Sequence, residues 1–179
     1  DFARFLPAVL PPLLAAFSVA PEEVSAPEDQ QDMTLMMLGN QKCVGLKTSH
    51  IEDLSSALTT VSSFIELMGG SGYRDFIKET ALRLMPLLEF QFDDDVKSLA
   101  ITTWGHLVKC ASDINEAALA KDLTKGYFDY AKKTMPHEED LDILEVQARG
   151  VSACVSSALP GSIDSAVGGE IVTLIFSLL

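Results

Sequence analysis

MPLLEFQFDDDVKSLA, residues 85–100, is the stretch that decides the fold class. Apolar residues recur at helical spacing on both sides of it. The acidic run Asp93–Asp95 stands where negative charge favours the N-terminus of a new helix, and Pro86 should kink the preceding helix near its end. The stretch therefore predicts two antiparallel helices that meet at a charged corner.

The same helical hairpin recurs along the chain. Displacing residues 96–111 by about 44 positions places Leu107 on Val151 and Cys110 on Cys154. A period of about 40–47 residues is typical of HEAT repeats, whose paired helices stack into a curved rod. We therefore predict an all-α fold, an α-α superhelix built as a HEAT-repeat solenoid of about three and a half helical hairpins.

We expect residues 1–179 to form a single solenoid segment. The helical periodicity predicts helices at about 2–17, 51–68, 73–90, 95–111, 114–134, 138–159 and 163–179. Ser49 and Glu52 have the spacing of a capping box at the start of the second helix, and the glycines within 69–72 should end it. The apolar run at 171–179 would expose a hydrophobic helix face at a natural terminus, so we expect a fragment.

Residues 19–50 interrupt the helical pattern. Prolines, acidic residues and paired glutamines predict a mobile acidic insertion here. The apolar patch Met33–Leu38 inside it either docks on the solenoid as a short turn of helix or shares the disorder of the insertion. No segment of the chain shows the clear alternation that predicts a β-strand.

Composition narrows the class of partner. Apolar content of 47% with only 7% aromatic residues favours an aliphatic helical core over a β-sandwich. The formal charge of −13 repels nucleic-acid phosphates and anionic membranes and attracts basic proteins. The alternative is that the acidity only keeps an aliphatic helical protein soluble. No run approaches the roughly 20 apolar residues that a membrane-spanning helix needs.

Nothing in the sequence predicts catalysis, a metal or a cofactor. The cysteines are odd in number and lack metal-binding spacing, which indicates buried thiols in a reducing compartment. The histidines are widely spaced, and no nucleophile elbow, phosphate-binding loop or zinc-protease motif occurs. The glycines within 69–72 lack the preceding strand and following lysine of a phosphate loop, so a helix stop explains them better.

Several short motifs follow one another in an order and spacing that resemble a known family. They are Phe5-Leu6-Pro7, Pro12-Leu13-Leu14, Gly45-Leu46-Lys47-Thr48, Ile51-Glu52-Asp53, Ser55-Ser56-Ala57 and Met85-Pro86-Leu87-Leu88 with Phe90 and Phe92. The family is the karyopherin-beta (importin-beta) superfamily, and the closest branch is importin-five, also called karyopherin beta-three. Beyond Asp113 the match is mainly periodic, and the insertion lacks the dense acidic run with an aromatic residue that similar receptors have.

The resemblance implies a central fragment of a nuclear transport receptor. Such a receptor binds basic cargo localisation signals on a concave acidic surface, releases them on binding Ran-GTP and contacts the FG-repeat proteins of nuclear pores. It shuttles between cytoplasm and nucleus, and we expect a monomer. The alternative is a HEAT-repeat scaffold that assembles other proteins, as a phosphatase regulatory subunit does. An enzyme with an unrecognised helical site is the least favoured class.

In arrays of this kind the second helix of each hairpin lines the concave side. Residues there that point away from the apolar stripes are candidate cargo contacts, since carboxylates pair with lysine or arginine and an indole covers an aliphatic stem. These candidates are Glu52, Asp53, Glu66, Trp104, Glu138, Glu139, Asp142 and Glu145. Asp95 and Lys97 resemble the acid and base that form a structural ladder between HEAT repeats. The alternative is a solvated acidic face and a core tryptophan.

Overall fold

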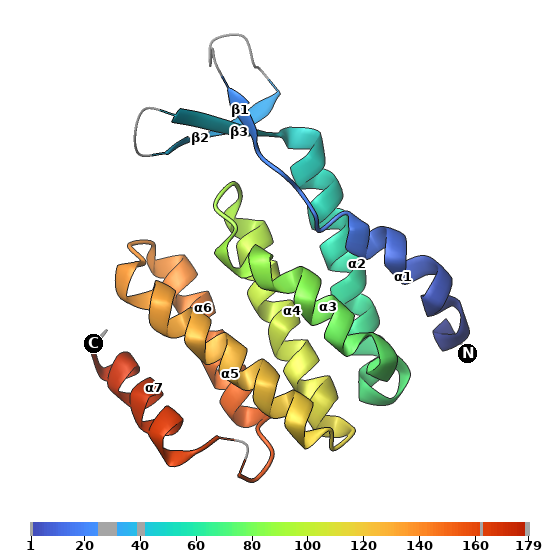
Figure 1. Cartoon of the computed structure of the whole chain (residues 1–179), viewed down its shortest axis with the longest axis vertical. Coiled ribbons are helices and arrows are strands. Elements are labelled where there is room, and N and C mark those ends of the chain that lie inside the picture. Colours follow the sequence, from blue (N-terminus) through green and yellow to red (C-terminus); the bar gives the residue numbers. More distant parts are fainter. Residues whose placement is uncertain (1, 25–31, 39–41, 162, 178–179) are drawn as a thin grey trace.

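The computed structural model describes residues 2–24, 32–38, 42–161 and 163–177 (Figure 1). The α-helices are α1 (Leu6–Ala15), α2 (Thr48–Tyr73), α3 (Ile77–Leu84), α4 (Asp94–Asp113), α5 (Ala117–Thr134), α6 (Leu141–Ser156) and α7 (Ser165–Ser177). Short 3-10 helices lie at Phe2–Phe5, Arg74–Phe76, Met85–Glu89 and Met135–His137. Three strands, β1 (Glu22–Val24), β2 (Met33–Leu38) and β3 (Lys42–Lys47), lie between α1 and α2 in the sequence.

The helices form two layers of paired helices (Figure 1). Helix α4 packs between α2 and α6, and these three helices run in the same direction. Helices α1, α3 and α5 pack against α2, α4 and α6 respectively, while α7 packs on α5. Stacked helical hairpins of this kind are the HEAT architecture. The predicted all-α superhelix is confirmed, and in the described residues three helix pairs are followed by α7.

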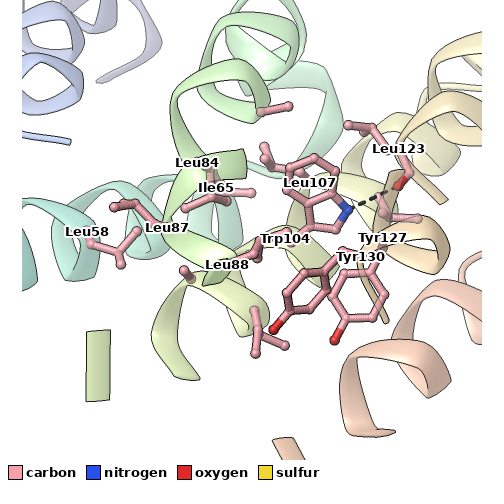
Figure 2. Packing of buried hydrophobic residues seen from close by; sticks show 14 of the residues in the cluster. Leu58, Ile65, Leu84, Leu87, Leu88, Trp104, Leu107, Leu123, Tyr127 and Tyr130 are labelled. Atoms are coloured by element: carbon pink, nitrogen blue, oxygen red, sulfur yellow. Dashed lines mark hydrogen bonds between the residues drawn. The ribbon is translucent and has the colours of Figure 1, made fainter. Parts of the chain in front are cut away.

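The apolar stripes of the helices meet in one continuous core. In α2, Leu54, Leu58 and Ile65 recur at helical spacing and are fully buried. Trp104 of α4 is 1% exposed, and its indole Nε1 donates a hydrogen bond to the main-chain oxygen of Leu123 at 3.1 Å (Figure 2). The buried indole therefore joins α4 to α5 in the centre of the segment.

Two glycines allow the helices to approach closely. A Cβ at Gly70 would overlap the main-chain oxygen of Cys110, so this glycine fixes the spacing of α2 and α4. The Cys110 thiol donates to the oxygen of Ile65 across the same interface at 3.7 Å. A Cβ at Gly150 would overlap the hydroxyl of Tyr127, so α5 and α6 also depend on a glycine for their spacing.

The strands form a small antiparallel sheet in the order β1-β3-β2, with Met33 opposite Lys47 and Leu35 opposite Gly45. The sheet lies at one end of the helices, and Leu46 of β3 joins the helical core (Figure 1). The expectation that no segment forms a strand is wrong, as is a helical turn at Met33–Leu38. A short apolar run fits a strand and a buried helix equally well, and here pairing with β3 decides. Residues 25–31 and 39–41 of the predicted mobile insertion lie outside the described residues.

The second predicted helix also starts earlier than its capping motif suggests. Lys47 is the N-cap residue of α2 and makes no side-chain capping hydrogen bond, so the capping box expected at Ser49 and Glu52 is wrong. The main-chain amide of Thr48 donates instead to the carbonyl oxygen of Asp32 at 2.9 Å. The residue just before β2 therefore satisfies one of the free amides of the first helical turn.

The glycine-rich segment ends the first helical stretch of α2 at Gly69, as predicted, and a second short helical stretch follows across a kink. Gly69 has φ 59° and ψ −173°, a backbone conformation outside the helical region, and helical winding then resumes as far as Tyr73. The helix expected at 73–90 is divided into the turn at Arg74–Phe76, helix α3 and the turn at Met85–Glu89. Pro86 lies in the last of these turns. Because proline has no main-chain N–H to donate, it interrupts the α-helical hydrogen bonds, and the chain forms a 3-10 helix there.

Candidate functional site

Helices α2, α4 and α6 all begin at the end of the molecule that carries the sheet (Figure 1). Each start is rich in carboxylates: Glu52, Asp53, Asp93, Asp94, Asp95, Asp140 and Asp142. We call these residues the acidic edge. Asp93 caps α4 by accepting a hydrogen bond from the Val96 amide at 2.8 Å, and Asp140 caps α6 by accepting from the amides of residues 142 and 143. The carboxylates of the acidic edge therefore stabilise the starts of these helices and also give this surface its negative charge.

A groove opens at this edge between the starts of α2 and α4. It has a volume of about 590 Å³, and three carboxylates line it, from Glu52, Asp93 and Asp95. Thr34 of β2 forms part of its wall. Hydroxyl side chains of α2 supply more of the wall, namely Ser55, Ser56, Thr59 and Thr60. We call this feature the acidic groove, and its chemistry suits cationic or hydrogen-bonding groups.

The structure brings only some of the predicted contact residues together. Glu52 lies in the acidic groove, and Asp95, which was predicted with Lys97 to belong to a structural ladder between repeats, lies there as well. Asp53 is exposed on the same turn of α2. Glu66 is exposed on α2 but lies 14 residues beyond Glu52, about 21 Å along the helix axis at 1.5 Å per residue, so it belongs to the opposite end of the layer.

Lys97 pairs with Glu138, which precedes α6 in the next hairpin. The Lys97 Nζ lies 2.7 Å from Glu138 Oε2, and the two side chains are 14% and 17% exposed. The pair links the first turn of α4 to the segment before α6, so Lys97 does connect neighbouring hairpins. The prediction that Glu138 contacts a ligand is corrected, since its carboxylate is engaged in this largely buried ion pair.

Trp104 is a second correction. Its side chain is buried in the core and its indole nitrogen is already hydrogen-bonded, so it does not lie on the concave surface as predicted. Helix α4 contacts α2, α3, α5 and α6, and a helix with neighbours on so many sides buries nearly its whole circumference. The core tryptophan considered as the alternative is therefore the observed state.

The predicted acidic residues of α6 remain on the surface. Glu139 and Asp142 are exposed, and Glu145 forms an exposed ion pair with Arg149 at 2.5 Å. Sequence reasoning missed a second groove between α4 and α6, where the basic side chains Lys109 and Arg149 are each paired with a carboxylate. This groove has a volume of about 330 Å³ and is lined by His106, Lys109 and Arg149 among others. The surface of the layer formed by α2, α4 and α6 thus changes from acidic at its helix starts to mixed charge further along the helices.

An apolar groove lies between α3 and α5, in the other layer. Its volume is about 450 Å³, and Leu82, Met85, Pro86 and Leu119 line it. Leu82 is 77% exposed. The sequence could have indicated this groove. Leu82 and Met85 stand outside the apolar stripe of their helix, and side chains of this size and apolar character are unusual on an ordinary surface.

No protein-family model matches the chain, but its fold matches solved structures. A structure of Kap121p bound to RanGTP matches with a TM-score of 0.79 at 19% identity, and the match covers 99% of this chain and 18% of that one. The chain shares the fold of part of this karyopherin structure. The karyopherin Kap121p bound to the extreme C-terminus of the protein phosphatase Cdc14p gives a TM-score of 0.78 at 20% identity, covering 93% and 17%. Kap121p bound to Nup53p gives 0.73 at 21% identity, with the same coverage.

The karyopherin chains are much longer than this one, which spans less than a fifth of their length. Among the residues that the structure describes, no group of three or more His, Cys, Asp or Glu side chains is arranged to hold a metal ion. The described helices also include none with the length and apolar character needed to cross a membrane.

Proposed function

We propose that the chain is a segment of a nuclear transport receptor of the karyopherin-beta superfamily, related to its importin-five branch, and that the acidic groove holds cationic side chains of cargo localisation signals. The observation that carries the proposal is the position of this groove, at the starts of α2 and α4 on a karyopherin fold. The motif order in residues 5–92 and the formal charge of −13 support the same assignment. The function is binding, with no catalytic step.

The groove chemistry sets the strength of this binding. A single exposed pair between lysine and carboxylate contributes only about 0–1 kcal/mol. Useful affinity therefore requires several basic residues that bind together, some in the groove and others along the acidic edge. Because these charges are exposed, binding should weaken strongly as the salt concentration rises. Glu52 and Asp95 are the groove carboxylates whose exposure leaves them available to a ligand.

The remaining partners belong to the full-length receptor. Ran-GTP releases cargo in this proposal, and the receptor shuttles between cytoplasm and nucleus as a monomer. The apolar groove between α3 and α5 is the candidate surface for phenylalanine side chains of FG-repeat proteins, because Leu82 and Met85 offer exposed apolar area there. Structures of Kap121p with RanGTP and with Nup53p support assigning such partners to a protein of this fold.

Charge reversal tests the role of the groove. A fluorescent peptide with four lysines would be titrated against the chain and against the double variant Glu52→Lys, Asp95→Lys. We expect the double variant to lose about 1–2 kcal/mol of binding free energy, or roughly five- to thirtyfold in Kd. The matched control is Asp75→Lys, Glu79→Lys, which makes the same change in net charge at exposed sites around α3. Equal loss in both double variants would contradict a groove-specific contact.

Ran-GTP separates the receptor from the scaffold alternative. The full-length protein loaded with a lysine-rich peptide should release it when Ran-GTP is added, and should retain it with Ran-GDP. Retention in both cases would favour a HEAT-repeat scaffold that assembles other proteins. The measurement needs only the fluorescence anisotropy of the labelled peptide.

A further inference from the structure

Strand β2 is an edge strand of the small sheet. The order β1-β3-β2 pairs one side of β2 with β3 over all six residues, and no strand in the described part of the chain pairs with its other side. Alternate residues of an edge strand direct their main-chain N–H and C=O groups outward, where they serve as a template for another extended chain. The open side of β2 therefore offers a row of main-chain donors and acceptors.

This open strand begins next to the acidic groove. Thr34 of β2 forms part of the groove wall with Glu52 and Asp95. The carbonyl oxygen of Asp32, just before β2, accepts a hydrogen bond from the Thr48 amide at 2.9 Å. That bond fixes the start of the strand against the first turn of α2. A chain added alongside β2 would consequently run past the groove carboxylates.

The two faces of β2 differ in chemistry. Thr34 lies opposite Leu46, a buried residue of the helical core, so this face of the sheet is directed toward the helices and the groove. Leu35 and Met37 lie on the other face and are 37% and 66% exposed. A peptide strand added beside β2 would direct every second side chain toward the carboxylates of the acidic groove. Its remaining side chains would lie beside the exposed apolar side chains of Leu35 and Met37.

We propose that the open side of β2 binds an extended peptide of alternating cationic and apolar residues as an additional strand, with its cationic side chains directed to the acidic groove. The inference rests on the proposed function, because it describes how a basic signal would be held. Charge complementarity selects this occupant over a second copy of the chain. Two copies with a formal charge of −13 each would bring carboxylates against carboxylates at the same edge.

Backbone methylation of a peptide tests the added strand. The probe is an eight-residue peptide in which lysine and valine alternate, titrated against the 179-residue chain. Two further peptides carry N-methyl groups on the lysine amides or on the valine amides, which removes donors from one side of the extended peptide. We expect one of these two peptides to lose about tenfold or more in affinity while the other binds like the parent. Equal affinities of the two methylated peptides would overturn the inference.

Hydrogen exchange gives a second measurement on the protein itself. With the parent peptide bound, every second amide within Met33–Leu38 should exchange more slowly, because those amides donate to the peptide. Unchanged exchange throughout β2 would count against strand addition.

The outcomes separate this inference from the proposed function. Loss of peptide binding in the Glu52→Lys, Asp95→Lys variant, together with equal affinities of the two methylated peptides, would leave the groove as a cation site and refute the added strand. Binding that ignores charge reversal at both positions would refute the groove itself. In that second case the proposed function would fail regardless of the methylation result.

Discussion

Replacing Gly150 by alanine tests the packing that sets the distance between α5 and α6. A Cβ at this position would overlap the buried Tyr127 hydroxyl and lie 2.9 Å from the Ile101 side chain. Tyr127 is fully buried, and its hydroxyl donates to the main-chain oxygen of Gln147 at 2.9 Å. The added methyl group therefore forces either the tyrosine ring or helix α6 to move, and it breaks this hydrogen bond if the ring moves.

The magnitude follows from three contributions. Overpacking of a dense core costs about 1–3 kcal/mol, and losing the hydrogen bond costs about 0.5–1.5 kcal/mol. The higher helix propensity of alanine offsets about 1 kcal/mol. The free energy of unfolding should therefore fall by about 2 kcal/mol, within a range of about 0.5–3.5. For a chain of this length that lowers Tm by about 4–8 °C, measurable by circular dichroism at 222 nm.

Gly169→Ala is the matched control, since a Cβ there meets no atom within 4 Å and Gly169 lies within α7. It should leave Tm unchanged or raise it slightly. Tyr127→Phe in the Gly150→Ala background should recover part of the loss, because the overlapping hydroxyl is gone. Equal Tm values for the two alanine variants, or strictly additive effects of the two changes at the interface, would refute this account of the packing.

Three further predictions address the links between elements. Lys97→Met and Glu138→Gln should each cost about 1–3 kcal/mol, since either leaves a largely buried charge unpaired, and the double variant should cost less than their sum in urea unfolding. Asp93→Ala should cost about 1 kcal/mol by removing the cap on the Val96 amide, checked by the urea midpoint against Asp94→Ala. Burial raises the pKa of Tyr73 from 10.0 to about 12, so its contribution to stability is complete below pH 10 and is lost as pH rises toward 12. Tyr73→Phe should remove that part of the alkaline loss in a pH series of thermal melts.

Sequence periodicity was a good guide to where α4 begins and to the main apolar stripe that it buries. Asp93 does cap α4, and Val96 and Leu107 are fully buried as their spacing indicates. The repeat of hairpins also followed from the sequence, because each hairpin must cover its apolar face with the next one. These features depend on local spacing, which a single sequence records directly.

The features that the sequence did not indicate depend on contacts between residues far apart in the chain. Trp104 is buried because α4 has neighbours on several sides, and a helical periodicity cannot report how many partners surround a helix. Glu138 precedes α6 and turns back to Lys97, 41 residues away. The sheet formed because β2 pairs with β3, and strand pairing is not encoded in either apolar run alone.

Carbodiimide coupling of a bound lysine-rich peptide tests the central claim most directly. The reagent joins a lysine amine to a carboxylate only where the two are in contact, and mass spectrometry then identifies the carboxylate. The account predicts that coupling occurs at Glu52 and Asp95, where the starts of α2 and α4 form the acidic groove. Coupling confined to carboxylates around α3, such as Asp75 and Glu79, would contradict it.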